Sequence, residues 1–136
     1  MRQLITLLAL FFATTLNAEI LVVVGKASPI EHVNEQEVAN IFLAKTNRLA
    51  DGSRITPLKL SDQNYEFNFY YKISGKNPSQ IASYWTALIF TGKGKPPKEF
   101  KEKNKLQEEL TNNPGAMAYI LAEQLSDQMK VIYTFN

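Results

Sequence analysis

The sequence contains no cysteine and only one histidine, His32. Without cysteine there is no disulfide, no thiol nucleophile, no thiolate metal ligand and no lipid-carrying cysteine behind a leader peptide. Glu31 and Glu35 stand near His32, but three residues so close together make poor zinc geometry. No serine nucleophile and no pair of acidic residues stands where His32 could act on it as a base in nucleophilic catalysis. We therefore expect a protein that is not an enzyme, holds no metal and needs no cofactor.

The sequence also lacks a strong excess of either charge. Its 15 basic and 13 acidic residues leave a formal net charge of +2 at pH 7. This balance predicts neither nucleic-acid binding nor strong attraction to a membrane surface. The length of 136 residues suits one domain and is too short for two full lobes with a cleft between them.

A largely apolar run stands at the N-terminus. Met1 and Arg2 give a positive start, Leu4–Phe12 is apolar, and the stretch up to Ala18 is small and polar, which is the pattern of a secretory signal peptide. The run is shorter than the roughly 20 residues of a membrane span. A buried N-terminal helix is the less favoured alternative. We expect residues 1–18 to be removed, leaving residues 19–136 as one soluble periplasmic or secreted domain that is not inserted in a membrane.

The rest of the chain predicts alternating strands and helices. Ile20–Val24 is a continuous apolar run typical of a strand buried on both faces. Asn34 and Glu37 form a capping box that begins a helix, and Ile55–Leu60 reads as a second strand. Strand, helix and strand in this order predict a right-handed parallel βαβ unit.

Further elements are expected along the remaining chain. They are helices over 61–73, from 77 to the loop 91–97, and over 99–112, then a strand at 116–120, a short helix at 122–125 and a strand at 129–135. This order predicts an α/β fold in which a mixed, mostly parallel sheet is flanked by helices on both faces.

Several ordered segments resemble a known family. They are Val22–Val24 with Pro29, Val38–Lys45, Ile55–Leu60 leading into Phe67–Phe69, and Pro114–Ile120. Together they are similar to the phosphate-binding components of ABC transporters, which have the type II periplasmic-binding-protein fold. Short stand-alone versions resemble the chain more closely, at Ile41–Thr46, Asp51-Gly52, Tyr84-Trp85, Leu88–Gly94 and Pro114–Tyr119. The resemblance implies a single lobe of that fold, a solute-binding role and a phosphate-like ligand.

The resemblance also implies an anion site where a helix follows the second strand. In the family a basic residue ends this strand, and a loop of small residues opens the helix and holds the phosphate. Lys59 could stand for the basic residue, and Ser61 and Asn64 are the polar candidates. However, this loop contains no glycine, and Asp62 and Glu66 place two negative charges at the helix start.

A second candidate site is the loop that begins with Thr91, Gly92, Lys93 and Gly94. Its glycines allow left-handed backbone, successive N–H groups can form an anion-binding nest, and lysines supply charge. The spacing does not match a P-loop. The structural alternative is a helix that ends at Gly92 and is followed by a proline-stiffened turn.

These observations leave two functions open. The first is a periplasmic binding module of the phosphate-transporter type, which holds a small anion weakly, alone or with a second copy completing the cleft. Its candidate ligand-binding residues are Ser61, Asn64, Thr91, Gly92, Lys93, Gly94 and Lys59. The second is an interaction module that keeps the fold without a ligand. It would dock a periplasmic protein, or a second copy, through the aromatic helix of residues 65–73 or the lysine-rich stretch of residues 93–105.

Overall fold

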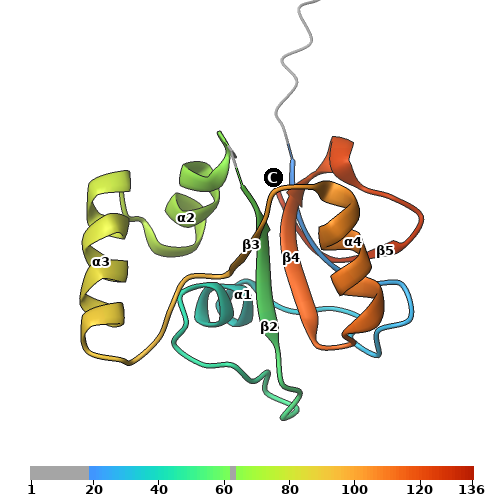
Figure 1. Ribbon diagram of the computed structural model, residues 1–136, viewed down its shortest axis with the longest axis horizontal. Helices are drawn as coiled ribbons and strands as arrows, with labels where there is room; N and C mark the ends of the chain where they lie inside the picture. Colours follow the sequence, from blue (N-terminus) through green and yellow to red (C-terminus); the bar gives the residue numbers. More distant parts are fainter. Residues whose placement is uncertain (1–18, 62–63) are drawn as a thin grey trace, which may run out of the picture.

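The computed structural model describes residues 19–61 and 64–136 (Figure 1). The predicted signal peptide, residues 1–18, and the predicted helix residue Asp62 lie outside the described residues. In the described part, every helix is too short or too polar to span a membrane.

The described residues form one five-stranded sheet with strand order β3-β2-β4-β1-β5. The strands are β1 (Ile20–Gly25), β2 (Thr56–Leu60), β3 (Lys98–Phe100), β4 (Ala116–Leu121) and β5 (Met129–Phe135). β2 pairs in parallel with β3 and β4, whereas β1 pairs antiparallel with β4 and β5. The predicted mixed sheet is confirmed, but it is not mostly parallel, because two of the four strand pairings are parallel and two are antiparallel.

The predicted parallel βαβ unit is wrong. β4 lies between β1 and β2, and it runs parallel to β2 but antiparallel to β1. β1 and β2 therefore run in opposite directions. All six residues of β1 are buried, as the apolar run predicted. The apolar run predicts that β1 is buried, but it does not predict the direction of the strand. The direction of β1 is set by its pairing with β4, which is distant in the sequence.

Four α-helices and one 3₁₀ turn complete the described part. They are α1 (Glu35–Phe42), α2 (Glu66–Ser74), α3 (Pro78–Phe90), α4 (Lys103–Asn112) and η1 (Ala122–Gln124). The predicted capping box is confirmed, because the Asn34 side chain accepts a hydrogen bond from the N–H of Glu37. The Asn77 side chain accepts one from the N–H of Gln80 in the same way and caps α3. α4 packs on one face of the sheet and α1 and α2 on the other, with α3 at the outer edge (Figure 1).

Two predicted helix starts differ in the structure. The helix expected from Ser61 begins at Glu66 instead, and the one expected from Glu99 begins at Lys103. The reason is β3, which pairs with β2 and places the Phe100 carbonyl beside Ser61. Ser61 donates to that carbonyl through its backbone N–H at 2.7 Å and through its hydroxyl at 3.2 Å. A strand of three residues, two of them charged, gives no apolar pattern that would predict it.

The larger of the two core clusters lies under α1 and α2 and has packed aromatic rings at its centre. The Phe69 ring stacks on Tyr119, with ring centroids 3.8 Å apart, and Phe42 and Tyr70 contact it edge-on at 5.2 and 5.3 Å. Of the phenylalanines and tyrosines of α2, Phe69 and Tyr70 are buried, whereas Phe67 is 53% exposed. The other face of the sheet is covered by aliphatic residues, including Leu106 and Leu110 of α4.

The hydroxyl of Tyr119 is buried and has no hydrogen-bond partner in the described structure. An unsatisfied buried polar group costs about 1–3 kcal/mol. Tyr119→Phe should therefore raise the free energy of unfolding by about 1 kcal/mol in urea denaturation. Tyr70→Phe is the control, because the Tyr70 hydroxyl donates to the Phe42 carbonyl at 3.3 Å and its loss should not stabilise. A destabilised Tyr119→Phe variant would contradict this reading.

Candidate functional site: a lysine-lined pocket

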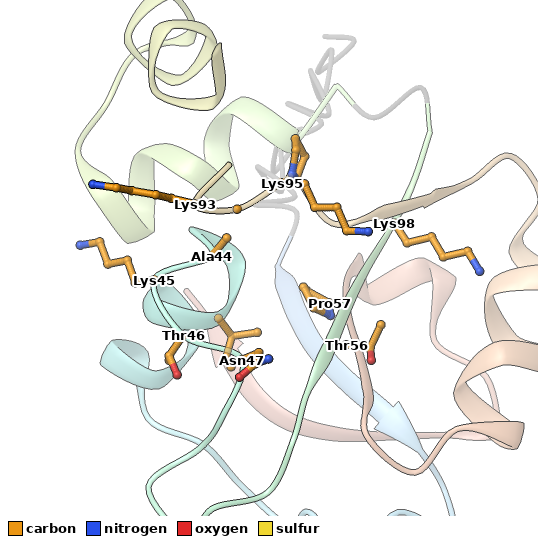
Figure 2. A pocket seen from close by; sticks show the side chains of 12 residues that line it. Ala44, Lys45, Thr46, Asn47, Thr56, Pro57, Lys93, Lys95 and Lys98 are labelled. Carbon is orange, nitrogen blue, oxygen red and sulfur yellow. The ribbon is translucent and has the colours of Figure 1, made fainter. Parts of the chain in front are cut away.

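A partly open pocket of about 610 Å³ lies where the end of α1, the loop before β3 and the start of β2 meet (Figure 2). We call it the lysine pocket. Its lining residues are Ile41, Ala44, Lys45, Thr46, Asn47, Thr56, Pro57, Lys93, Gly94, Lys95, Pro96 and Lys98.

The first wall of the pocket comes from the C-terminal end of α1. Ala44 has a left-handed backbone, with φ at 56°. The N–H of Ala44 donates to the Ile41 carbonyl at 3.1 Å, and that of Lys45 donates to the Asn40 carbonyl at 2.9 Å. This bonding pattern is a Schellman motif, which ends the helix and reverses the chain. The reversal places the residues from Lys45 to Asn47 along the pocket.

The second wall begins at the C-terminal end of α3, which closes in the same way. Gly92 has φ at 67°, and its N–H donates to the Ile89 carbonyl at 3.1 Å. The N–H of Lys93 donates to the Leu88 carbonyl at 3.0 Å, and the Thr91 hydroxyl donates to the Ala87 carbonyl at 2.8 Å. The helix end considered as the structural alternative is thus present. Because these N–H groups already donate to carbonyls of α3, they are not available as an anion-binding nest. The loop contributes the Lys93 side chain to the pocket instead.

Gly94 brings the two walls together. A Cβ atom added at this position would lie 2.9 Å from Cδ2 of Leu88 and 3.0 Å from Cβ of Ala44. Both distances are shorter than normal packing allows, so a glycine permits the loop to approach the end of α1 this closely. The role of Gly94 is therefore close packing between two helix ends, which forms one side of the pocket.

The charge of the pocket has one sign. Lys45, Lys93, Lys95 and Lys98 line it, and its lining contains no aspartate or glutamate. In the described part of the chain, the ion pairs join Lys59 to Glu66, Lys105 to Glu108 and Lys130 to Glu31, and none involves a pocket lysine. Hydroxyl and amide groups of Thr46, Asn47 and Thr56 add hydrogen-bonding capacity. This arrangement is suited to holding an anion by charge attraction and hydrogen bonds.

The other predicted site residues lie apart from the lysine pocket. Lys59, Ser61 and Asn64 stand at or beyond the carboxyl end of β2 and do not line it. The Lys59 ammonium lies 2.6 Å from a carboxylate oxygen of Glu66, and both side chains are partly buried. Ser61 bonds to the Phe100 carbonyl, and Asn64 is exposed. Of the seven predicted residues, the structure places Lys93 and Gly94 in the pocket, with Thr91 and Gly92 next to it.

Sequence reasoning missed the pocket residues Lys45, Thr46, Thr56 and Lys98. They come from three segments separated in the sequence, and none stands in a motif typical of anion binding. Their nearness depends on the contact between Gly94 and Ala44, for which the sequence carries no signal.

Histidine and carboxylate groups do not gather elsewhere in the described part of the chain. No group of three histidine, aspartate or glutamate residues is arranged there to hold a metal ion. His32 is exposed, and its neighbour Glu31 accepts a hydrogen bond from Lys130 at 2.9 Å. The expected absence of a metal or cofactor stays a prediction.

Comparisons with known proteins support the fold. No protein-family model matches the chain, and no curated sequence is similar to it. Solved structures do match. An ABC-type phosphate transport receptor from Vibrio cholerae has a TM-score of 0.54 at 11% identity, over 85% of this chain and 46% of its own. A phosphate ABC transporter substrate-binding protein from Clostridium perfringens, with bound phosphate, has a TM-score of 0.58 at 12% identity, over 85% and 45%.

A possible phosphate binding protein from Planctomyces limnophilus also has a TM-score of 0.58, at 17% identity, over 85% of this chain and 41% of its own. The chain thus spans less than half the length of each of these proteins. Their names describe receptors and binding proteins rather than enzymes. At such low identity the similarity establishes the fold alone. The predicted resemblance is confirmed at that level: the chain has the α/β fold of a lobe of phosphate substrate-binding proteins.

Proposed function

We propose that the protein is an exported solute-binding module that binds a small, phosphate-like anion weakly in the lysine pocket. The observation that carries this proposal is the set of four lysines around one pocket without a carboxylate in its lining. The bound phosphate of the Clostridium perfringens neighbour agrees with anion binding on this fold. Binding and release need no nucleophile or acid–base pair, in keeping with a role other than catalysis.

The physical basis of binding is charge attraction across a partly open site. At about 4 Å, an ammonium and an anion attract by about 1 kcal/mol in bulk water and more where water is partly excluded. Lysine side chains that reach into solvent keep much of their hydration, so each contact stays weak. The Debye length is about 8 Å at physiological salt. We therefore expect affinity that falls as the salt concentration rises.

Lys45 and Lys93 also follow the C-terminal ends of α1 and α3. A positive charge at a helix C-terminus stabilises the helix. Replacing either lysine can therefore lower stability without any ligand being involved. A test of binding must measure the ligand-dependent shift of each variant against its own ligand-free state.

We predict that phosphate or sulfate raises the melting temperature of the purified protein. An anion at about 100 times its dissociation constant adds about 2.7 kcal/mol to the stability. Lys93→Ala should remove most of this gain in a thermal-shift assay. Lys101→Ala is the matched control, because Lys101 is an exposed lysine outside the pocket and its loss changes the net charge equally. No shift with any anion, or equal losses in both variants, would contradict the proposal.

The ligand-less interaction module is the second candidate. It is favoured by large apolar side chains on the outer helices, since Tyr71 of α2 is 64% exposed and Phe90 of α3 is 91% exposed. Exposed apolar groups of this size are often contacts for another protein. This function predicts that cross-linking in the periplasm captures a partner protein or a second copy, and that Phe90→Ser abolishes the capture while anions leave the melting temperature unchanged.

A further inference from the structure

The four lysines of the pocket are arranged as two pairs. Lys45 and Lys93 follow the ends of α1 and α3, and Lys95 and Lys98 belong to the segment that leads into β3. In Figure 2 the ammonium ends of Lys45 and Lys93 point to one side of the pocket, and those of Lys95 and Lys98 point to the opposite side, where the Lys98 ammonium lies 5.2 Å from the centre of the Phe100 ring. The positive charge is therefore divided between two ends instead of converging on one point.

Much of the surface between the two pairs is apolar, with polar groups added by Thr46, Asn47 and Thr56. Ile41, Ala44, Pro57 and Pro96 line the pocket, and Ala44 and Pro57 lie between the lysine pairs in Figure 2. The volume of about 610 Å³ falls in the range of about 300–1,000 Å³ that is typical of small-molecule sites. A tetrahedral oxyanion that contacts one lysine pair would leave the apolar surface and the other pair unused.

We propose that the pocket is built for an elongated organic dianion with an acidic group at each end and an apolar body between them. This inference rests on the proposed function, because it names the ligand class of the same site. One acidic group contacts Lys45 and Lys93, and the other contacts Lys95 and Lys98. The apolar body covers Pro57 and its neighbours. Carboxylates and phosphates share the chemistry that the ammonium groups recognise, so either can form the two ends.

A ligand that carries both acidic groups on one molecule binds more tightly than two separate anions do. Once one acidic group is bound, the other is held near the second lysine pair at a high effective concentration, and affinity is greatest when the spacer matches the distance between the pairs. Each methylene buried against the apolar surface strengthens binding by about fourfold. A linear dianion of suitable length should therefore bind at least about tenfold more tightly than the monoanion of the same length.

The experiment is calorimetric titration of the purified protein with linear α,ω-dicarboxylates of increasing length. The comparison ligands are monocarboxylates of matching length, α,ω-bisphosphates and inorganic phosphate. We expect an optimal dicarboxylate length, and weaker binding of the monocarboxylates and of inorganic phosphate. The bisphosphate arm shows whether carboxylate or phosphate ends are preferred, and either preference supports the two-ended site.

Paired substitutions test which end each lysine pair serves. Lys45→Ala with Lys93→Ala, and separately Lys95→Ala with Lys98→Ala, should each reduce dicarboxylate affinity to that of the monocarboxylate. Lys101→Ala with Lys103→Ala is the control, because it removes the same charge from exposed lysines outside the pocket and should keep the ratio. Circular dichroism and ligand-free melting establish that each variant is folded.

Three results would overturn the inference. If inorganic phosphate binds as tightly as every dicarboxylate, the two-ended site is wrong and the anion-binding function stands. If monocarboxylates match the dicarboxylates, or if one lysine pair alone accounts for the affinity, the second end has no role. If no anion binds, both the inference and the proposed function fail.

Discussion

Replacing Phe69 by alanine should lower the free energy of unfolding by about 3–5 kcal/mol, measured by urea denaturation. Phe69 is fully buried and stands at the centre of the aromatic core. It stacks on Tyr119 and also meets Phe42, Tyr70 and Phe135 edge-on. Truncation would remove these contacts and leave a cavity that a close-packed core fills only in part. The loss should be among the largest for any single side chain of the protein.

Phe67→Ala is the matched control for Phe69→Ala. Both phenylalanines belong to α2 and lose the same atoms, but Phe67 is 53% exposed. Its replacement should change stability by no more than about 0.5 kcal/mol, as is usual for surface positions. Similar losses for the two variants would mean that α2 does not present Phe69 to the sheet.

Alkaline pH should destabilise the fold through three buried tyrosines. Burial raises the pKa of the phenols of Tyr65, Tyr70 and Tyr119 above the usual value near 10. Above pH 10 or so, the unfolded chain releases these protons while the folded protein keeps them. Stability is therefore fully present below the unfolded pKa and falls as the pH rises above it. Each phenol contributes about 1.4 kcal/mol per pH unit, or about 4 kcal/mol for the three together.

Urea denaturation at a series of pH values around and above about 10 measures this slope. Tyr119→Phe should reduce the slope by about one third, because one of the three linked protons is then absent. The same variant is expected to be more stable at neutral pH, so a smaller slope cannot be ascribed to a damaged fold. If the slope is the same in the protein and in Tyr119→Phe, the pKa of the Tyr119 phenol is not raised in the folded protein.

The lysine pocket and the predicted helix-start site differ in how their charges are used. The Lys59 ammonium is paired with Glu66 inside the fold, whereas the pocket lysines form no ion pair in the described part of the chain. An internal carboxylate already neutralises the charge at the end of β2. Positive charge at the lysine pocket is left to attract a solute, which is why the proposed site lies there.

Features that depend on neighbouring residues could be predicted from the sequence. The caps at Asn34 and Asn77, the burial of β1 and the helix end at Gly92 all rest on interactions within a few residues or on an unbroken apolar run. Local backbone preferences and side-chain hydrogen bonds decide these features wherever the segment lies in the fold. The α/β class followed from the order of these local elements.

Only the tertiary structure decided the features that join distant segments. β1 and β2 run in opposite directions because β4 lies between them and pairs with both. The short strand β3 forms by pairing with the free edge of β2. The lysine pocket forms because Gly94 lets one helix end approach another at Ala44. Strand pairing and close packing are made between residues far apart in the chain, so no local pattern in the sequence can encode them.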